Sequence, residues 1–179
     1  SDEEGGSGFS HRYAVVTSST TPPTEWGSMG TNNAYSVSLN SLGIHYIHYK
    51  VLDYAGNETV SYFGPFTITD AAPPSAPSIG TSPVYSDGTW TNLATTVSAS
   101  GSVDDFTATE NIKYEVSVDG APYVEASSAA LSVSGEYTIT FKATDESGNS
   151  TTASKIVKVD LIAPAEPVAA MTSGGESYT

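Results

Sequence analysis

An internal repeat constrains the fold of this chain more than any other feature. The segment GIHYIHYKVLDYAGN at 43–57 aligns without a gap with GEYTITFKATDESGN at 135–149, 92 residues further along. Downstream, FTITDAAPPSAP at 66–77 aligns without a gap with IVKVDLIAPAEP at 156–167. A period of about 90 residues is close to the size of a small β-sandwich domain. The sequence therefore predicts that one fold is built twice.

Apolar and polar residues alternate through most of both copies, as they do in β-strands, and helical periodicity is almost absent. In the first copy, Ile47, Tyr49 and Val51 share one face of a predicted strand. His48 and Lys50 share the opposite face. The pattern predicts the last two strands of each copy at 43–52 and 60–69, and at 135–144 and 152–159.

The pentapeptides DYAGN at 53–57 and DESGN at 145–149 connect these predicted strand pairs. An Asp side chain can accept a hydrogen bond from a backbone N–H nearby, and a Gly can adopt a positive φ. Both properties favour a tight hairpin loop. We therefore interpret each pentapeptide as a turn first and as a binding site only second.

The second copy, placed at 75–163, has all the strands expected of a complete sandwich. A short strand is predicted near 82–85, and the dipeptide Asp119-Gly120 predicts a two-residue hairpin turn. Lys142 is expected outside the core. The predicted core consists of Val97, Tyr114, Val116, Leu131, Val133, Ile139 and Phe141.

The first copy, placed at 1–74, has no counterpart of 78–101, so it is predicted to be a sandwich without its leading strands. Such a sandwich leaves unpaired backbone and apolar surface in contact with water. Residues 164–179 are predicted to be the leading strand of a further unit or a donor strand. Either the tail 165–179 of another copy fills the gap, or neighbouring residues of a longer chain do.

Charge and composition exclude several classes of partner. The chain has 20 Asp and Glu against 6 Lys and Arg, which gives a formal charge of −14 over 179 residues. Because six basic side chains cannot neutralise a row of phosphates, neither nucleic acid nor an anionic membrane surface is an expected partner. The chain contains no Cys, which excludes disulfides and thiolate zinc sites. It has no apolar run long enough to cross a membrane and no recognisable signal peptide.

Four motifs occur in a fixed order in the second copy: WTN at 90–92, YEVSVDGAPY at 114–123, GEYTITFKATDESGN at 135–149 and VDLIAP at 159–164. Together they resemble the bacterial Ig-like repeats of large surface and secreted proteins. The resemblance covers nearly all of 78–164 and the later part of 9–77. It implies an all-β fold of tandem Ig-like antiparallel β-sandwiches. It also implies an extracellular stalk, adhesin or filament at the bacterial cell surface, with neighbouring repeats or other copies of the chain as partners.

Residues that could support catalysis are few. His45 and His48 are three apart on a predicted strand, so they point to opposite faces and cannot chelate one metal ion. His11 is isolated in the sequence. There is no Gly-x-Ser-x-Gly elbow and no phosphate-binding loop. We expect no enzymatic activity and no catalytic residues.

We expect a module without a cofactor, and calcium is the one cofactor that the sequence offers as an alternative. Carboxylates at the joints of tandem sandwiches suit a hard cation that takes six to eight oxygen ligands, although no EF-hand spacing is present. The predicted ligands are Asp70, Asp145, Glu146 and Asp160. The acidic residues Asp2, Glu3 and Glu4, and Asp104 and Asp105 at the matching place, are interpreted as solvated loops.

A carbohydrate-binding module is the other alternative, with host or matrix glycans as ligands. Trp26 lies in the insertion 17–32 of the first copy, where an aromatic ring could stack on a sugar. Trp90 matches the opening Trp of the Ig-like motif and is expected to pack within the sandwich. Tyr13 aligns with Tyr114, and both are expected in the core. Lys50 and Lys142 lie on polar faces and are expected to be solvated rather than cross-linked.

Overall fold

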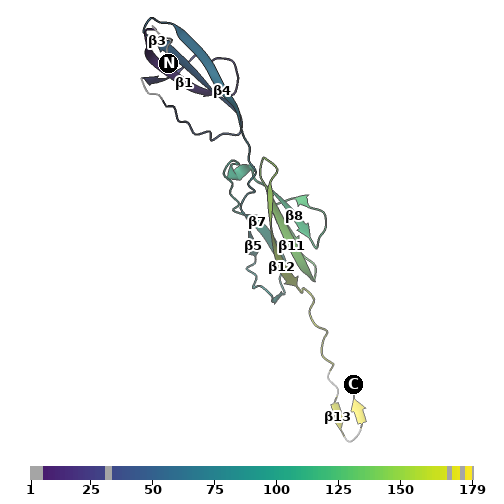
Figure 1. The fold of residues 1–179 in the computed structure, drawn as a ribbon. Helices are drawn as coiled ribbons and strands as arrows, with labels where there is room; N and C mark the ends of the chain where they lie inside the picture. Colours follow the sequence, from purple (N-terminus) through teal and green to yellow (C-terminus); the bar gives the residue numbers. More distant parts are fainter. Residues whose placement is uncertain (1–5, 31–33, 169–170, 174–175, 179) are drawn as a thin grey trace. The chain divides into compact units, whose positions relative to one another are not determined.

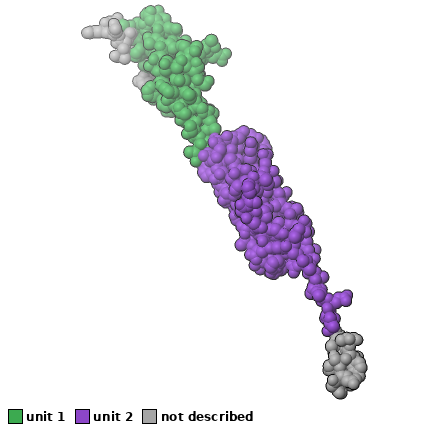
Figure 2. Space-filling view, turned by 90° about the vertical axis from the view of Figure 1, so that its right-hand side faces the viewer, with its two compact units in different colours: residues 1–71 green, residues 72–179 purple. Residues whose placement is uncertain are grey.

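The structure is a computed structural model that describes residues 6–30, 34–168, 171–173 and 176–178. Its sheets are antiparallel apart from one short parallel pairing, and the helix it contains in these ranges is the 3-10 turn Thr109–Asn111. The prediction of an all-β fold is confirmed. The chain divides into two compact units, unit 1 at Ser1–Ala71 and unit 2 at Ala72–Thr179 (Figures 1 and 2). Across the described residues, no helix is long and apolar enough to cross a membrane.

Unit 1 contains one four-stranded antiparallel sheet in the order β2-β1-β3-β4 (Figure 1). Its strands are β1 (Phe9–Thr17), β2 (Gly27–Gly30), β3 (Gly43–Asp53) and β4 (Glu58–Ile68). The predicted strands at 43–52 and 60–69 correspond to β3 and β4. The acidic residues Asp2, Glu3 and Glu4 lie outside the described residues.

Unit 2 is a sandwich of two sheets that share one core. A three-stranded sheet has the order β10-β7-β5, and a five-stranded sheet has the order β6-β12-β11-β8-β9. Side chains of both sheets meet in a single hydrophobic cluster that includes Val97, Leu131, Ile139 and Phe141. Its strands are β5 (Ser78–Ser82), β6 (Trp90–Thr91), β7 (Thr95–Ser100), β8 (Lys113–Val118), β9 (Val124–Glu125), β10 (Ser128–Leu131), β11 (Gly135–Thr144) and β12 (Ser150–Val159).

The tail of the chain carries two further short strands, β13 (Met171–Ser173) and β14 (Glu176–Tyr178). These strands pair with each other in an antiparallel hairpin.

The predicted hairpin turn between β8 and β9 is present, because Asp119 and Gly120 have φ values of 51° and 77°.

Most of the predicted core of unit 2 is correct, and one residue is wrong. Five of the predicted residues are at most 4% exposed, and Tyr114 packs against their cluster. Val133, however, is 67% exposed. Strand β10 ends at Leu131, so the alternation of inward and outward side chains stops before Val133, in the turn that leads to Gly135. The five buried residues are Val97, Val116, Leu131, Ile139 and Phe141.

The strand that carries Tyr13 pairs in a different register from its counterpart in unit 2. Tyr114 pairs with Ala143, whose side chain is fully buried in the core. The alignment of the two copies would pair Tyr13 with Val51, but Tyr13 pairs with Lys50. A shift of one residue turns a side chain to the other face of the sheet. The prediction that Tyr13 faces the core is therefore wrong.

The insertion of unit 1 covers the sheet face that carries His48 and Lys50. His48 is fully buried, and its Nε2 lies 2.8 Å from the backbone oxygen of Ser19. The Lys50 Nζ lies 5.1 Å from the ring centroids of both Tyr13 and Trp26. With 21% of its side chain exposed, Lys50 is only partly solvated, less than the sequence predicted.

The expectation that Lys142 lies outside the core of unit 2 is confirmed, and the expectation for Trp90 is wrong. Lys142 lies outside the core, as expected, but it is only partly exposed and forms an ion pair with Glu115 at 2.7 Å. Trp90 was expected inside the sandwich, yet it is 59% exposed. It lies on the two-residue strand β6, beside Lys158 of β12, whose Nζ lies 5.9 Å from the centroid of its ring.

Candidate metal centre

The hairpin loop between β11 and β12 is closed by hydrogen bonds between Asp145 and Asn149. The backbone N of Asp145 donates to the Asn149 carbonyl at 3.0 Å, and the Gly148 N donates to the Asp145 carbonyl at 3.3 Å. The Asp145 carboxylate accepts from the Asn149 backbone N at 2.8 Å and from Asn149 Nδ2 at 3.0 Å. Gly148 has a φ of 92°, which favours glycine. The prediction of a tight turn is confirmed here.

The corresponding loop of unit 1 repeats this geometry. Asp53 N donates to the Asn57 carbonyl at 3.0 Å, and Gly56 N donates to the Asp53 carbonyl at 3.3 Å. Asn57 donates to the Asp53 carboxylate at 2.8 Å and 2.7 Å, and Gly56 has a φ of 91°. Two segments 92 residues apart therefore form the same turn with the same side chains.

The surroundings of Asp145 keep its carboxyl ionised. The residue is only 5% exposed. Burial alone would raise the pKa of this carboxyl, but hydrogen bonds from the Asn149 side chain and from the backbone of Asn149, Gly148 and Ser147 outweigh burial and lower the pKa. In unit 1, the hydrogen bond from the Asn57 side chain is the largest influence on Asp53, and the pKa of that carboxyl is also lowered.

A second loop of unit 2 places Asp104 near this turn. Asp104 Oδ1 accepts hydrogen bonds from the backbone N of Phe106 at 2.9 Å and of Thr107 at 2.8 Å. Thr107 is buried, and its Oγ1 accepts a hydrogen bond from the backbone N of Glu146 at 3.1 Å. The Asp104 loop and the Asp145 turn are thus held together by the Thr107–Glu146 bond.

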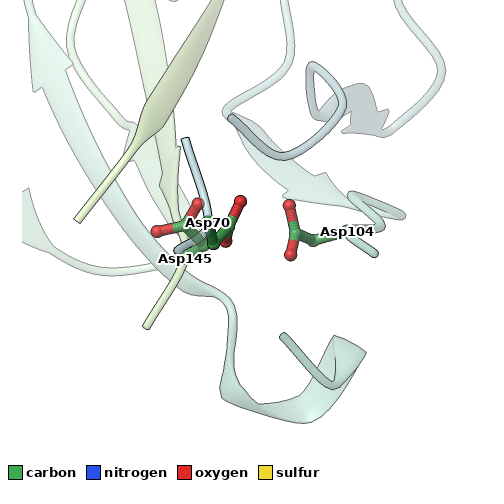
Figure 3. Close-up of side chains that lie close together, drawn as sticks. All are labelled: Asp70, Asp104 and Asp145. Carbon is green, nitrogen blue, oxygen red and sulfur yellow. The ribbon is translucent and has the colours of Figure 1, made fainter. Parts of the chain in front are cut away.

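Asp70 completes a group of three carboxylates with Asp104 and Asp145 (Figure 3). Each residue offers one oxygen, and these three oxygens lie within 4.8 Å of one another. Asp70 comes from the connecting segment 69–77, which has no regular secondary structure. Further along that segment, Ser75 is bound to Val103: Ser75 N donates to the Val103 carbonyl and Val103 N donates to Ser75 Oγ, both at 2.9 Å.

The geometry of this group fits a calcium ion. Calcium binds carboxylate oxygens at about 2.3–2.6 Å, so two ligands of one ion lie at most about 5 Å apart. Negative charges on carboxylates this close repel one another, and a divalent cation would relieve that repulsion.

Two of the four predicted metal ligands belong to this group, and two do not. Glu146 instead accepts a hydrogen bond from Asn111 Nδ2 at 3.1 Å. Asp160 follows the end of β12, whereas Asp145 precedes its start, so a strand of about 30 Å separates them. Asp104 was interpreted as part of a solvated loop; it does lie in a loop, where it is half-buried and accepts two backbone hydrogen bonds. The sequence signal for it was Asp104 three residues before Thr107, a spacing that favours side-chain capping of a turn.

The other candidate residues occupy separate environments. His45 Nε2 lies 2.8 Å from the Ser41 carbonyl, on the face of β3 opposite to His48. Neither residue belongs to the metal-ligating group found among the described residues. Trp26 is half-buried, and its ring lies near Lys50 Nζ. Less of the ring surface is therefore accessible for stacking on a sugar than an exposed loop position would provide.

Comparison with known proteins does not assign this site. No family model matches the chain, and a search of curated proteins finds no significant match. The function is therefore argued from the geometry of the chain itself.

Proposed function

We propose that the chain is a non-enzymatic structural segment made of tandem Ig-like repeats, part of an extracellular bacterial stalk, adhesin or filament. One observation carries the proposal: both units contain a three-stranded antiparallel sheet with the same strand order, β1-β3-β4 in unit 1 and β8-β11-β12 in unit 2. In both units the same Asp–Gly–Asn turn closes the last hairpin. A chain that repeats one domain, with the same strand order and the same turn in each copy, suits a spacer, since each copy adds length.

The strand order of unit 2 supports the Ig-like assignment. In chain order, β5, β7 and β10 take the places of strands A, B and E, and they form one sheet. Strands β8, β11 and β12 take the places of C, F and G, with the two-residue β9 beside β8. An Ig fold separates its strands between two sheets in this way.

The pairing of β6 with β12 supports a load-bearing role. These two strands run parallel, with Trp90 opposite Lys158 and Thr91 opposite Val159, and Asp160 N donates to the Thr91 carbonyl at 2.8 Å. Because β6 is near the beginning of the unit and β12 is its last strand, a pull on the two ends drives the strands past each other. The hydrogen bonds between them are then loaded together rather than one after another.

Single-molecule pulling of the chain by its two ends tests this proposal. Unit 2 should unfold in one abrupt event that lengthens the chain by roughly 250 Å, since about 80 residues extend at about 3.3–3.6 Å each. A chain that lengthens gradually, with no abrupt event of this size, would contradict a load-bearing spacer.

Calcium binding by Asp70, Asp104 and Asp145 is a second candidate function, favoured by the spacing of their carboxylate oxygens. In this proposal the ion adds to the hydrogen bonds that already hold the Asp104 loop to the Asp145 turn, and so stabilises unit 2. Calcium binding is compatible with the spacer role, because the bound ion would change the stability of unit 2 and would not imply a catalysed reaction.

A further inference from the structure

Among the described residues, the inner face of the unit 1 sheet is less covered than its counterpart in unit 2. Residues paired across antiparallel strands have their side chains on one face. We define the inner face by such pairs: Tyr49 with Ala14, Ile47 with Phe63, and His45 with Phe66. The rings of Phe63 and Phe66 also contact each other, with centroids 5.3 Å apart.

Two residues of this face have completely buried counterparts in unit 2. Phe141, which aligns with Tyr49, is 0% exposed, and so is Ile139, which aligns with Ile47. Tyr49 is 41% exposed, and Phe63 is 67% exposed. A groove of about 280 Å³ lies on this part of unit 1, lined by residues that include Met29, Tyr35, Ile47, Tyr49 and Val51.

The segment beside this groove has the sequence of a strand but does not form one. Ser36–Leu39 (SVSL) aligns with β10 (SAAL), which pairs with β7 in unit 2. Among the described residues of unit 1, no strand corresponds to β7, and 34–40 has no regular secondary structure. Leu39, which aligns with Leu131, is half-buried, whereas Leu131 at the end of β10 is 4% exposed.

We propose that the inner face of unit 1 accepts an added β-strand of the β7 type, supplied from outside unit 1, which pairs with 36–39 and covers Tyr49 and Phe63. The inference rests on the proposed Ig-like architecture. Strand β7 defines the chemistry of the occupant: an uncharged extended segment in which every second residue is apolar. In TTVSAS, Val97 and Ala99 are at most 5% exposed and enter the core, while Thr96 and Ser98 point outward.

The position of β7 in its sheet favours this occupant over the tail of another copy. Pro77 aligns with Pro167, and β5 follows Pro77 directly, so the tail that follows Pro167 is the counterpart of β5. In the order β10-β7-β5, β5 pairs with β7 and never reaches β10. A donated tail would therefore leave the place beside 36–39 empty, whereas a β7-type strand fills it.

Hydrogen exchange of the whole chain, followed by NMR, tests the inference with a synthetic peptide of residues 92–101 (NLATTVSASG) as the probe. Without peptide, the amides of 36–39 should exchange fast, while those of 128–131 are protected by pairing with β7. At a peptide concentration about 100 times its Kd, exchange at 36–39 should slow by up to about 100-fold. Exchange at 128–131 should not change, because unit 2 already has its own β7.

Two matched comparisons make the outcome specific. A peptide with Val97→Asp and Ala99→Asp should not protect 36–39. In the chain, Phe63→Ser should weaken peptide binding by about 10-fold or more, because it removes an exposed ring that the added strand would cover, whereas Tyr54→Ser in the exposed hairpin loop should not. Both substitutions are at positions more than two-thirds exposed, so folding should be preserved.

Three results would overturn the inference. The first is equal binding of the native and the Asp-substituted peptides. The second is protection that arises elsewhere than at 36–39. The third is a self-association of the chain that protects 36–39 without peptide and disappears when 165–179 are deleted, which would assign the groove to the tail. If 128–131 are themselves unprotected, the Ig-like architecture of unit 2 is wrong, which distinguishes failure of the proposed function from failure of this inference.

Discussion

Asn149 donates two hydrogen bonds to the carboxylate of Asp145, one from its backbone nitrogen at 2.8 Å and one from its side-chain nitrogen at 3.0 Å. Asn57 donates the same two bonds to Asp53. An ionised carboxylate accepts both bonds, whereas a protonated carboxyl or an amide loses one acceptor. Each pair therefore makes both side-chain bonds only while the Asp is charged, in addition to the backbone bonds of its hairpin.

Replacement of Asp145 by Asn should therefore destabilise unit 2. The new amide nitrogen cannot accept the bond from Asn149 Nδ2, which leaves two donors facing each other in a buried place. We expect a lower midpoint in chemical denaturation, monitored by NMR signals of β11 and β12. Asp105→Asn, at an exposed carboxyl nearby, should leave the midpoint unchanged, and an equal effect of both substitutions would contradict the account.

Stability should fall in acid because of the same turns. The pKa values of Asp53 and Asp145 are lowered in the folded state, so each carboxylate stabilises the fold fully above its unfolded pKa of about 3.9. This contribution is lost as the pH falls through the lower folded pKa. Denaturation between about pH 6 and pH 2 should show the loss below about pH 4, and Asp145→Asn should flatten the profile. A profile unchanged by that substitution would contradict the assigned cause.

Calcium should raise the stability of unit 2. At a free calcium concentration about 100 times its Kd, binding to the folded state alone adds about 2.7 kcal/mol. Thermal denaturation with calcium and with chelator measures the difference. Asp104→Asn should abolish it while its amide oxygen still accepts the bonds that hold the loop, and Asp105→Asn should preserve it. If chelator has no effect on the chain, the three carboxylates do not form a calcium site.

Substitutions at equivalent positions should differ between the two units. Phe141→Ala removes a fully buried ring and should cost about 3–5 kcal/mol in the unfolding free energy of unit 2. Tyr49→Ala, at the aligned position of unit 1, should cost much less because its ring is 41% exposed. Val133→Ala should change stability by at most about 0.5 kcal/mol, as for other surface positions. Equal costs at Phe141 and Tyr49 would show that the inner face of unit 1 is covered.

The repeat and the alternating pattern were sufficient to predict the last two strands of each unit and most of the core of unit 2. The short strand predicted near 82–85 instead lies at Ser78–Ser82. Both signals are local, and the turns at Asp53 and Asp145 depend on residues within five positions of each other. The errors have non-local causes. Tyr13 depends on a register that shifts by one residue, and Trp90 depends on a pairing with Lys158 far along the chain. Val133 lies past a strand end that the alternation alone did not mark.

The candidate site shows the same division. Asp145 could be predicted because it lies in the repeated turn, and Asp70 because it precedes a proline-rich joint. Asp104 could not, because its place beside Asp145 depends on the bond between Thr107 and Glu146, which are 39 positions apart. Asp160 was included by analogy with Asp70, although the length of β12 separates it from the Asp145 turn.

The most direct test of the load-bearing role compares the unfolding force of three chains pulled by their ends. Asp160→Pro removes the N–H that donates to the Thr91 carbonyl, whereas Asp160→Ala removes only the side chain. The account predicts that unit 2 of the native chain and of Asp160→Ala unfolds at the same force in one abrupt event, and that Asp160→Pro unfolds at a lower force. Equal forces in all three chains would contradict the claim that the β6–β12 pairing carries the load.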